Sequence, residues 1–386
     1  MRFIAFISSR LRTVITTILI GMMAVSCIYE HLPQTEETGE SVTLYLVLNA
    51  DGAATRSFND PENGEGTVKK LRIIIFDWRY GQWIWEKQVL IDDFSSSADP
   101  VKVEVEPGRK RVYLIANDNV STYALYQGGS FSSFVFSDSQ LTSRMLEHVV
   151  VEKFSYIDPD TGKGPDFSGP WTEQDLLPMV CVKELEITRE QALNNVPVLA
   201  TFALQRCICE ADVNVSLKEG ADMTGKTIVV EYVSIDDNPS HQYLIEKKDE
   251  QSRTLLPSGD KRFSVKYVPS APVDIITGTL SHNFYLTENP YGTYANVREV
   301  GSDFSNHLEA EGYSGITTKL TICYDYSDSN STFRRTITRD LPYIIRNGRL
   351  IVNAVIVPPQ DSHSFDIDVK VDTRWTDRLE NVPVFE

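Results

Sequence analysis

The sequence predicts a mostly β protein built from two β-sandwich domains in tandem, and three observations support this class. Short β-rich segments follow one another along the chain, and helical stretches are few. Several of these segments alternate apolar and polar residues with period two, as half-buried strands do. Apolar residues make up 41% and charged residues 24% of the 386 residues, so the chain can bury a sizeable core.

The first 26 residues have the organisation of an export signal. Three arginines precede an apolar run of 12 residues, 14–25, which is too short to span a bilayer comfortably. The sequence Ala-Val-Ser-Cys that ends at Cys27 resembles a lipobox, although Ala24 stands where leucine is usual. We expect cleavage before Cys27 and lipid attachment to it. The alternative is an ordinary secretory signal with an incidental cysteine, and either one predicts export.

The stretch 41–56 begins as a strand and ends at an arginine. Its alternate apolar residues predict one buried face, made of Val42, Leu44, Leu46 and Leu48. Small and polar residues follow, which are typical of a solvent-exposed loop, and the loop ends at Arg56. A strand that is joined to the rest of the chain by a protease-sensitive loop can be removed after folding. Its removal leaves a groove for a strand of another chain. The alternative is that Arg56 is only a solvated loop arginine.

The rest of the chain supplies the strands of both sandwiches. We divide it into a signal peptide (1–26), a propeptide with the removable strand (27–56), an N-terminal domain (57–196) and a C-terminal domain (197–386). The segment 139–153 is expected to form one short helix. Strands are expected at 68–78, 82–91, 101–105, 111–116, 177–188, 198–218, 227–235, 262–268, 317–326, 333–340, 349–357 and 365–371.

Several of these stretches together resemble the fimbrillins, the lipoprotein-derived (type V) pilins of Gram-negative anaerobes. The similar stretches are the signal with its cysteine, the strand and loop ending in Ala-Thr-Arg, TVKKLRIIIFD, VEPGRKRVYLIAND, LLPMV, FALQRCICEADVNV and PYIIRNGRLIVNAVIV. They span nearly the whole chain in the family's order. The resemblance implies two tandem sandwiches of the transthyretin-like, Greek-key kind.

The resemblance also implies a maturation pathway. The precursor is carried to the outer membrane as a lipoprotein, and an arginine-specific surface protease then cuts between Arg56 and Ser57. The vacated groove accepts the C-terminal strand of a neighbouring subunit, so that a cell-surface fimbria grows and supports adhesion. The donor residues in this chain are Phe365, Ile367, Val369 and Val371. The implied partners are neighbouring fimbrial subunits, an anchor or tip subunit, the protease and the outer membrane.

Other roles remain open. The chain can be a fimbrial tip adhesin, or a fimbrial anchor, since CIYEHLP after the lipobox resembles the anchor group. Its C-terminal strand can also stay folded in its own sheet. A monomeric surface lipoprotein that binds glycan or protein is a further alternative, with Trp78, Trp83 and Trp85 as the stacking residues and core packing as their competing role.

The sequence predicts no enzyme, metal site or cofactor. A formal phosphate-loop match at 220–227 is followed by a β-branched run where a helix is needed, so we interpret it as a hairpin turn. The segment 158–169 lacks the later ligands of a calcium loop, and the six histidines have no ligand spacing. The net charge of −17 disfavours nucleic acid as a partner. Cys181, Cys207, Cys209 and Cys323 are expected to be buried thiols, with one or two disulfides as the alternative.

Overall fold

The structure is a computed structural model, and it confirms a mostly β chain. It describes residues 41–49, 68–94, 100–118, 123–127, 136, 141–153, 171, 176–250, 254–257, 262–291, 316–329, 331–357 and 368–375. Contacts divide the chain into the units Met1–Ser41 and Val42–Glu386, and all described strands lie in the second. Neither helix of the described residues is long and apolar enough to cross a membrane.

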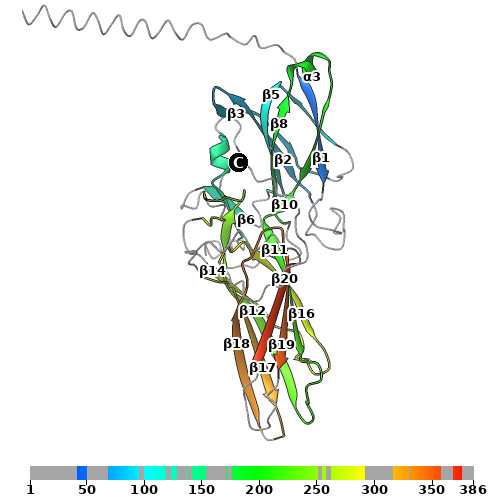
Figure 1. Cartoon of the computed structure of the whole chain (residues 1–386), viewed down its shortest axis with the longest axis vertical. Helices are drawn as coiled ribbons and strands as arrows, with labels where there is room; N and C mark the ends of the chain where they lie inside the picture. Colours follow the sequence, from blue (N-terminus) through cyan, green and yellow to red (C-terminus); the bar gives the residue numbers. More distant parts are fainter. Residues whose placement is uncertain are drawn as a thin grey trace, which may run out of the picture. The chain divides into compact units, whose positions relative to one another are not determined.

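The described strands form five sheets, which we number I to V. Sheets I to III have the following strand orders. Sheet I is β4 (Val101–Val105), β1 (Val42–Asn49) and β9 (Val198–Ala203); sheet II is β10 (Gln205–Arg206), β8 (Met179–Ile187), β5 (Gly108–Ala116), β2 (Leu71–Arg79) and β3 (Gln82–Ile91); sheet III is β13 (His241–Tyr243), β7 (Val149–Lys153) and β6 (Tyr123–Gln127). In Figure 1, β2, β5 and β8 of sheet II run beside one another.

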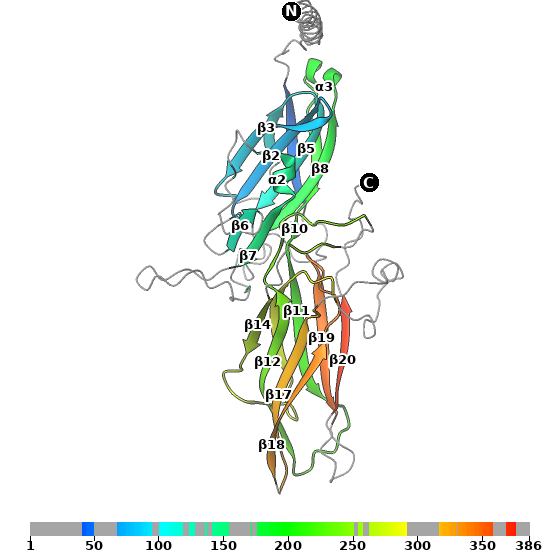
Figure 2. The ribbon, with the colours of Figure 1, turned by 90° about the vertical axis from the view of Figure 1, so that its left-hand side faces the viewer.

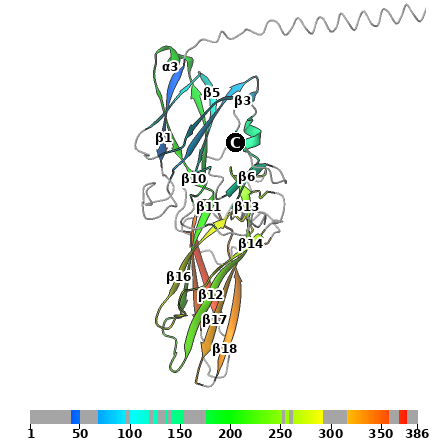
Figure 3. The same cartoon turned by 180° about the vertical axis from the view of Figure 1, so that it is seen from behind.

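Sheets IV and V contain the later strands. Sheet IV is β16 (Leu280–Thr287), β11 (Ile208–Leu217), β19 (Arg349–Val357) and β20 (Asp368–Trp375); sheet V is β14 (Arg262–Tyr267), β12 (Thr227–Pro239), β17 (Lys319–Ser327) and β18 (Thr332–Asp340), with β15 (Val273–Asp274) also paired to β12. Figure 2 shows β19 and β20 side by side, and Figure 3 shows β12, β17 and β18 together.

The inner strands β2 and β5 of sheet II are buried on both faces, and β2 shows how. Ile73 and Ile75 pack into an apolar cluster shared with sheet I. Ile74 and Phe76, which point the other way, pack into a second cluster with sheet III and the short helix α2 (Ser143–Leu146). A strand covered on both sides is apolar at nearly every position, as the run LRIIIF is apart from Arg72, which pairs with Asp118.

Sheets IV and V enclose a separate apolar cluster. Alternate residues of β19 supply one side of it, namely Leu350, Val352, Ala354 and Ile356. Residues of β12 and β17 supply the opposite side. Period-two alternation therefore places one face of each of these strands in the core.

Two sequence expectations need correction. The loop 220–227 is not a hairpin turn, because it leads from β11 in sheet IV to β12 in sheet V. Gly220 and Gly225 have φ angles of +73° and +70°, which explains the glycines without any phosphate. The segment 139–153 is not one helix, because among its described residues, 141–153, only Ser143–Leu146 is helical and Val149–Lys153 forms β7.

The junction expected at residue 197 precedes β9, and β9 is the parallel partner of β1 in sheet I. β10 also pairs with β8 of sheet II. The first strand of sheet IV is β11, which begins at Ile208. We therefore propose a domain junction near residue 207.

The core of sheets IV and V allows a matched test of which face of β19 is buried. Replacing the fully buried Ile356 with alanine (Ile356→Ala) should lower the free energy of unfolding by about 2–5 kcal/mol through lost burial and a cavity. Ile351→Ala, on the half-buried opposite face of β19, should cost less. Urea unfolding followed by circular dichroism measures both, and equal losses would contradict this placement of the core.

Candidate functional site

The first strand is held on both sides, and it occupies the centre of sheet I. β1 pairs antiparallel with β4, where Leu44 lies opposite Val103. It pairs parallel with β9, where Leu46 lies opposite Ala200. Among the described strands, β1 is what connects β4 to β9 in this sheet. Both main-chain ladders of sheet I therefore depend on one strand.

The predicted buried face of β1 is confirmed. Leu44 and Leu46 have no exposed surface, and Val42 and Leu48 are 2% and 8% exposed. These side chains pack with residues of sheet II in the same cluster. Full burial of one such side chain contributes about 1.5–3 kcal/mol, so the face as a whole is a strong attachment.

The opposite face of β1 is half-buried and held by β4. The hydroxyl of Thr43 donates to Glu104 Oε1 at 2.6 Å. The ammonium of Lys102 lies 5.4 Å from the centre of the Tyr45 ring. Such exposed polar contacts contribute little, so the buried face dominates the attachment of β1.

The predicted cleavage and lipidation residues lie outside the described part of the chain. These are Cys27, Arg56 and Ser57. The last described residue of β1 is Asn49, and the next residue that the structure describes is residue 68. The role of these residues stays a prediction.

The predicted donor segment is described in part. Phe365 and Ile367 lie outside the described residues, whereas Val369 and Val371 belong to β20. β20 pairs antiparallel with β19, with Val369 opposite Ile356 and Val371 opposite Ala354. It is the last strand of sheet IV in the described order. In this structure, the segment therefore completes its own sheet, as one of the sequence alternatives expected.

Two tryptophans of the β2–β3 hairpin, Trp78 and Trp83, contact each other and two arginines. Trp78 is 40% exposed, and its ring centre lies 4.9 Å from that of Trp83. Arg111 covers Trp83 at 4.4 Å, and Arg109 lies 5.5 Å from the same ring. Both guanidinium groups also bind Glu184. Trp83 and Trp85 are partly buried against the core, so packing accounts for them better than stacking on a sugar.

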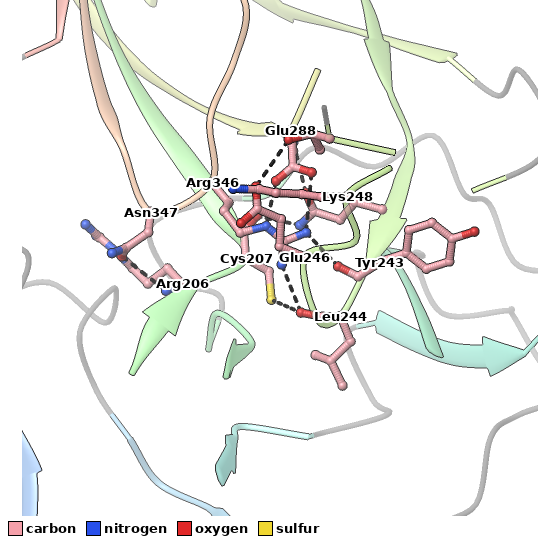
Figure 4. Close-up of polar contacts among 11 residues, drawn as sticks. Arg206, Cys207, Tyr243, Leu244, Glu246, Lys248, Glu288, Arg346 and Asn347 are labelled. Atoms are coloured by element: carbon pink, nitrogen blue, oxygen red, sulfur yellow. Dashed lines mark hydrogen bonds and ion pairs between the residues drawn. The ribbon is translucent and has the colours of Figure 1, made fainter. Parts of the chain in front are cut away.

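A buried ion pair that the sequence analysis did not anticipate lies between Arg346 and Glu288 (Figure 4). Arg346 Nε donates to Glu288 Oε2 at 2.6 Å, and both side chains are almost fully buried. Arg346 Nη2 donates to the carbonyl of Tyr243 at 2.8 Å, and Nη1 to that of Leu244 at 3.0 Å. The guanidinium thus fixes a loop as well as a carboxylate.

The same region holds the segment that leads from β10 to β11. Gln242 Nε2 donates to the carbonyl of Cys207, and Gln242 Oε1 accepts from the backbone N–H of Glu288 at 2.9 Å. Asn347 Oδ1 accepts from the backbone N–H of Arg206 at 3.1 Å. Burial alone lowers an arginine pKa, but Glu288 outweighs it and the pKa of Arg346 is raised. Burial raises the pKa of Glu288, although Arg346 opposes this.

The four described cysteines are free thiols, as predicted; Cys207, Cys209 and Cys323 are buried, whereas Cys181 is half-buried. Burial raises the pKa of Cys181 and of Cys207 to about 11 each. It raises the pKa of Cys209 further. Apolar surroundings therefore keep these sulfurs protonated and unreactive.

Comparison with known proteins connects the first strand to a family. Residues 41–138 match the family model of the major fimbrial subunit protein (FimA). The matched segment begins at β1 and extends beyond β5. Over these residues the chain is fimbrillin-like, which confirms the resemblance predicted from its sequence. No curated protein matches the chain.

The chain is also similar to solved structures. The tip fimbrial protein Mfa3 from Porphyromonas gingivalis, with a C-terminal truncation, is 15% identical; the match covers 86% of this chain and 99% of that one, with a TM-score of 0.43. The fimbrial anchor protein Mfa2 from Porphyromonas gingivalis is 11% identical, with 88% and 99% covered and a TM-score of 0.43. A fimbrial assembly protein from Parabacteroides distasonis is 11% identical, with 87% and 98% covered and a TM-score of 0.42.

The thiol burial gives one testable prediction. At pH 8, a thiol with a pKa of about 11 is ionised in about one molecule in a thousand, so iodoacetamide should leave Cys181 and Cys207 unmodified in the folded chain. Unfolding in urea should expose both to complete alkylation. Peptide mass spectrometry measures the modified fraction, and equal labelling in the two states would contradict their burial.

The ion pair gives another. Arg346→Met should lower the free energy of unfolding by about 3–5 kcal/mol, because it leaves Glu288 as a buried, unpaired carboxyl. The double variant Arg346→Met with Glu288→Met should lose less than the single one. Arg334→Met is the matched control, since Arg334 is 60% exposed and pairs with Asp325 in solvent, so its loss should be small. Urea unfolding compares the three variants with the parent chain, and a double variant that loses as much as Arg346→Met would contradict this explanation.

Proposed function

We propose that this chain is a structural subunit of a cell-surface fimbria that supports adhesion. The observation that carries the proposal is β1, a central strand buried on one face and embedded in the fimbrillin-like segment. The precursor is exported and lipidated at Cys27, and it reaches the outer membrane with β1 in place. Its role is assembly, not catalysis.

Maturation follows from the position of β1 in the chain. Cleavage between Arg56 and Ser57 releases β1, because no peptide bond then ties Val42–Asn49 to the strands that hold it. Loss of β1 exposes apolar surface on sheet II and the unpaired main-chain edges of β4 and β9. Such a surface binds a strand from another chain by main-chain hydrogen bonding and burial of alternate side chains.

The occupant that we propose is the C-terminal strand of a neighbouring subunit. Phe365, Ile367, Val369 and Val371 alternate with polar residues, which is the pattern that β1 itself shows on its buried face. The last two of these residues pair with β19 in the structure, so exchange requires β20 to leave sheet IV. The partners are further copies of the chain and, at the ends of the fibre, an anchor or tip subunit.

Proteolysis of the purified precursor tests the proposal. Brief treatment with an arginine-specific protease should give a new N-terminus at Ser57 and a ladder of multimers that resist SDS, because each inserted strand is deeply buried. N-terminal sequencing and gel electrophoresis are the measurements. Arg56→Ala should abolish both the cut and the ladder, and a chain ending at His363 should be cut without multimerising.

Each other outcome contradicts the stalk role and identifies an alternative. A clean cut at Arg56 that leaves only monomers indicates a tip adhesin or a monomeric binding protein. Resistance of Arg56 in the folded chain indicates a lipid-anchored subunit that keeps β1.

A further inference from the structure

A buried lysine lies between two carboxylates at one end of the sheet I–sheet II core. Lys110 of β5 has no exposed surface, and its Nζ is 3.0 Å from Asp77 Oδ1 and 2.6 Å from Glu86 Oε2. The side chains of Asp77 and Glu86 are only 6% and 10% exposed. We call these three residues the Lys110 triad. The contacts among them are not surface ion pairs, because water is almost excluded from all three side chains.

Strand register brings the triad together. Asp77 of β2 lies directly opposite Lys110 in the antiparallel β2–β5 ladder. Glu86 comes from β3, where the pairing shifts: Ile75 lies opposite Lys87, but Phe76 lies opposite Trp85. Glu86 is the extra residue of this bulge. A bulge redirects a side chain, and here the redirected carboxylate contacts Lys110 Nζ.

Each carboxylate is held in place by a further contact. Glu86 Oε1 accepts the backbone N–H of Glu106 at 2.9 Å, which leaves Oε2 for the lysine. Asp77 Oδ2 accepts from the guanidinium of Arg79. Asp77 Oδ1 is buried and faces Nζ without the alignment of a hydrogen bond. The amine and the carboxyl group are therefore neighbours that are not locked in a hydrogen bond with each other.

Gly108 allows this approach. A Cβ at this position would lie 2.7 Å from Asp77 Oδ1, and the glycine φ of +140° is unfavourable for other residues. The β5 backbone thus comes close to the carboxyl group and limits its movement. Reactive groups fixed at about 3 Å from each other are in the range from which intramolecular reactions are fast.

We propose that Lys110 and Asp77 join in an intramolecular amide bond, with Glu86 as the proton carrier. The Lys110 ammonium loses a proton to Glu86, and the free electron pair of Nζ attacks Cγ of Asp77. Negative charge develops on Oδ2, where Arg79 stabilises it. Nζ loses a second proton, Oδ1 receives both protons through Glu86, and the Cγ–Oδ1 bond breaks. An ammonium and a carboxylate become an amide and one water, and Glu86 ends unchanged.

Burial favours this product. Two charges out of contact with water carry a large desolvation cost, which a neutral amide does not. Water is also the leaving group, and the low exposure of the site opposes its return. The bond links neighbouring strands of sheet II, which supports sheet I and β1. It would keep β2 and β5 joined under any load that the chain carries.

Other lysine–aspartate pairs of the described residues differ in exposure. Lys319 Nζ is 2.6 Å from Asp237 Oδ2, but the two side chains are 36% and 38% exposed. Lys70 Nζ is 3.2 Å from Asp118 Oδ1, and Lys70 is 29% exposed. In each pair the lysine reaches solvent, which stabilises its charge, although Asp118 itself is only 1% exposed, so both pairs serve as internal controls.

Peptide mapping of the full-length chain purified after export tests the bond. After denaturation and trypsin digestion, we expect residues 73–79 attached to residues 110–111, with a mass lower by one water (about 18 Da) than the two peptides together. Glu86→Gln and Lys110→Arg should each yield residues 73–79 as a free peptide. Lys319→Met should keep the branched peptide.

The wild-type map decides the proposal even if a variant fails to fold. Recovery of residues 73–79 wholly as a free peptide from the folded wild-type chain would overturn the bond. A branched peptide that forms equally well in Glu86→Gln would overturn the role of Glu86 as proton carrier. A branched peptide between residues carrying Lys319 and Asp237 would show that simple proximity suffices, and would overturn the argument from burial.

Discussion

Burial of the inner strands of sheet II, β2 and β5, on both faces is the constraint on which the N-terminal part of the structure depends. One face needs sheet I as a cover, and the other needs sheet III with α2. Sheet I has only β4 on one side of β1 and β9 on the other, so its cover is complete only with β1 in the middle. A strand near the start of the chain thereby controls the exposure of a core made by residues far along the sequence. Loss of β1 would therefore expose one face of the inner strands of sheet II.

The period-two patterns of the sequence predicted most of the side chains that face the core. The alternation in 41–49 correctly identified the inward residues of β1. Pairing partners were not predictable from these patterns. β9 has the composition of any strand of a second domain, yet its parallel partner is β1, more than a hundred residues earlier. Alternation says which face is buried, but it carries no information about which strand lies alongside.

The two buried charge clusters show a different limit. Lys110 has a period-two spacing from Val112 and Leu114, which are both buried, so its position on the core face could have been recognised. The flanking Arg109 and Arg111 made the segment appear uniformly polar and hid this signal. Glu86 was not predictable, because its direction depends on a bulge that exists only in the paired sheet. Arg346 and Glu288 lie 58 residues apart, and only the fold brings them together.

The geometry of sheet I restricts what can replace β1. A substitute strand must form an antiparallel ladder with β4 and a parallel ladder with β9 at once, which fixes its direction. Its apolar residues must alternate in register with Leu44 and Leu46, since a shift by one residue would turn them toward the half-buried face. That face carries Lys102 and Glu104 of β4, so the outward residues of a substitute meet charges of both signs.

The segment after residue 364 alternates Phe, Ile and Val with Asp and Lys, and it meets these requirements on composition. Its residues 368–375 already pair with β19, so the proposed exchange would replace this ladder with the two ladders of sheet I. A second ladder, together with the full burial of the positions that Leu44 and Leu46 occupy, is therefore the gain that would favour the proposed exchange.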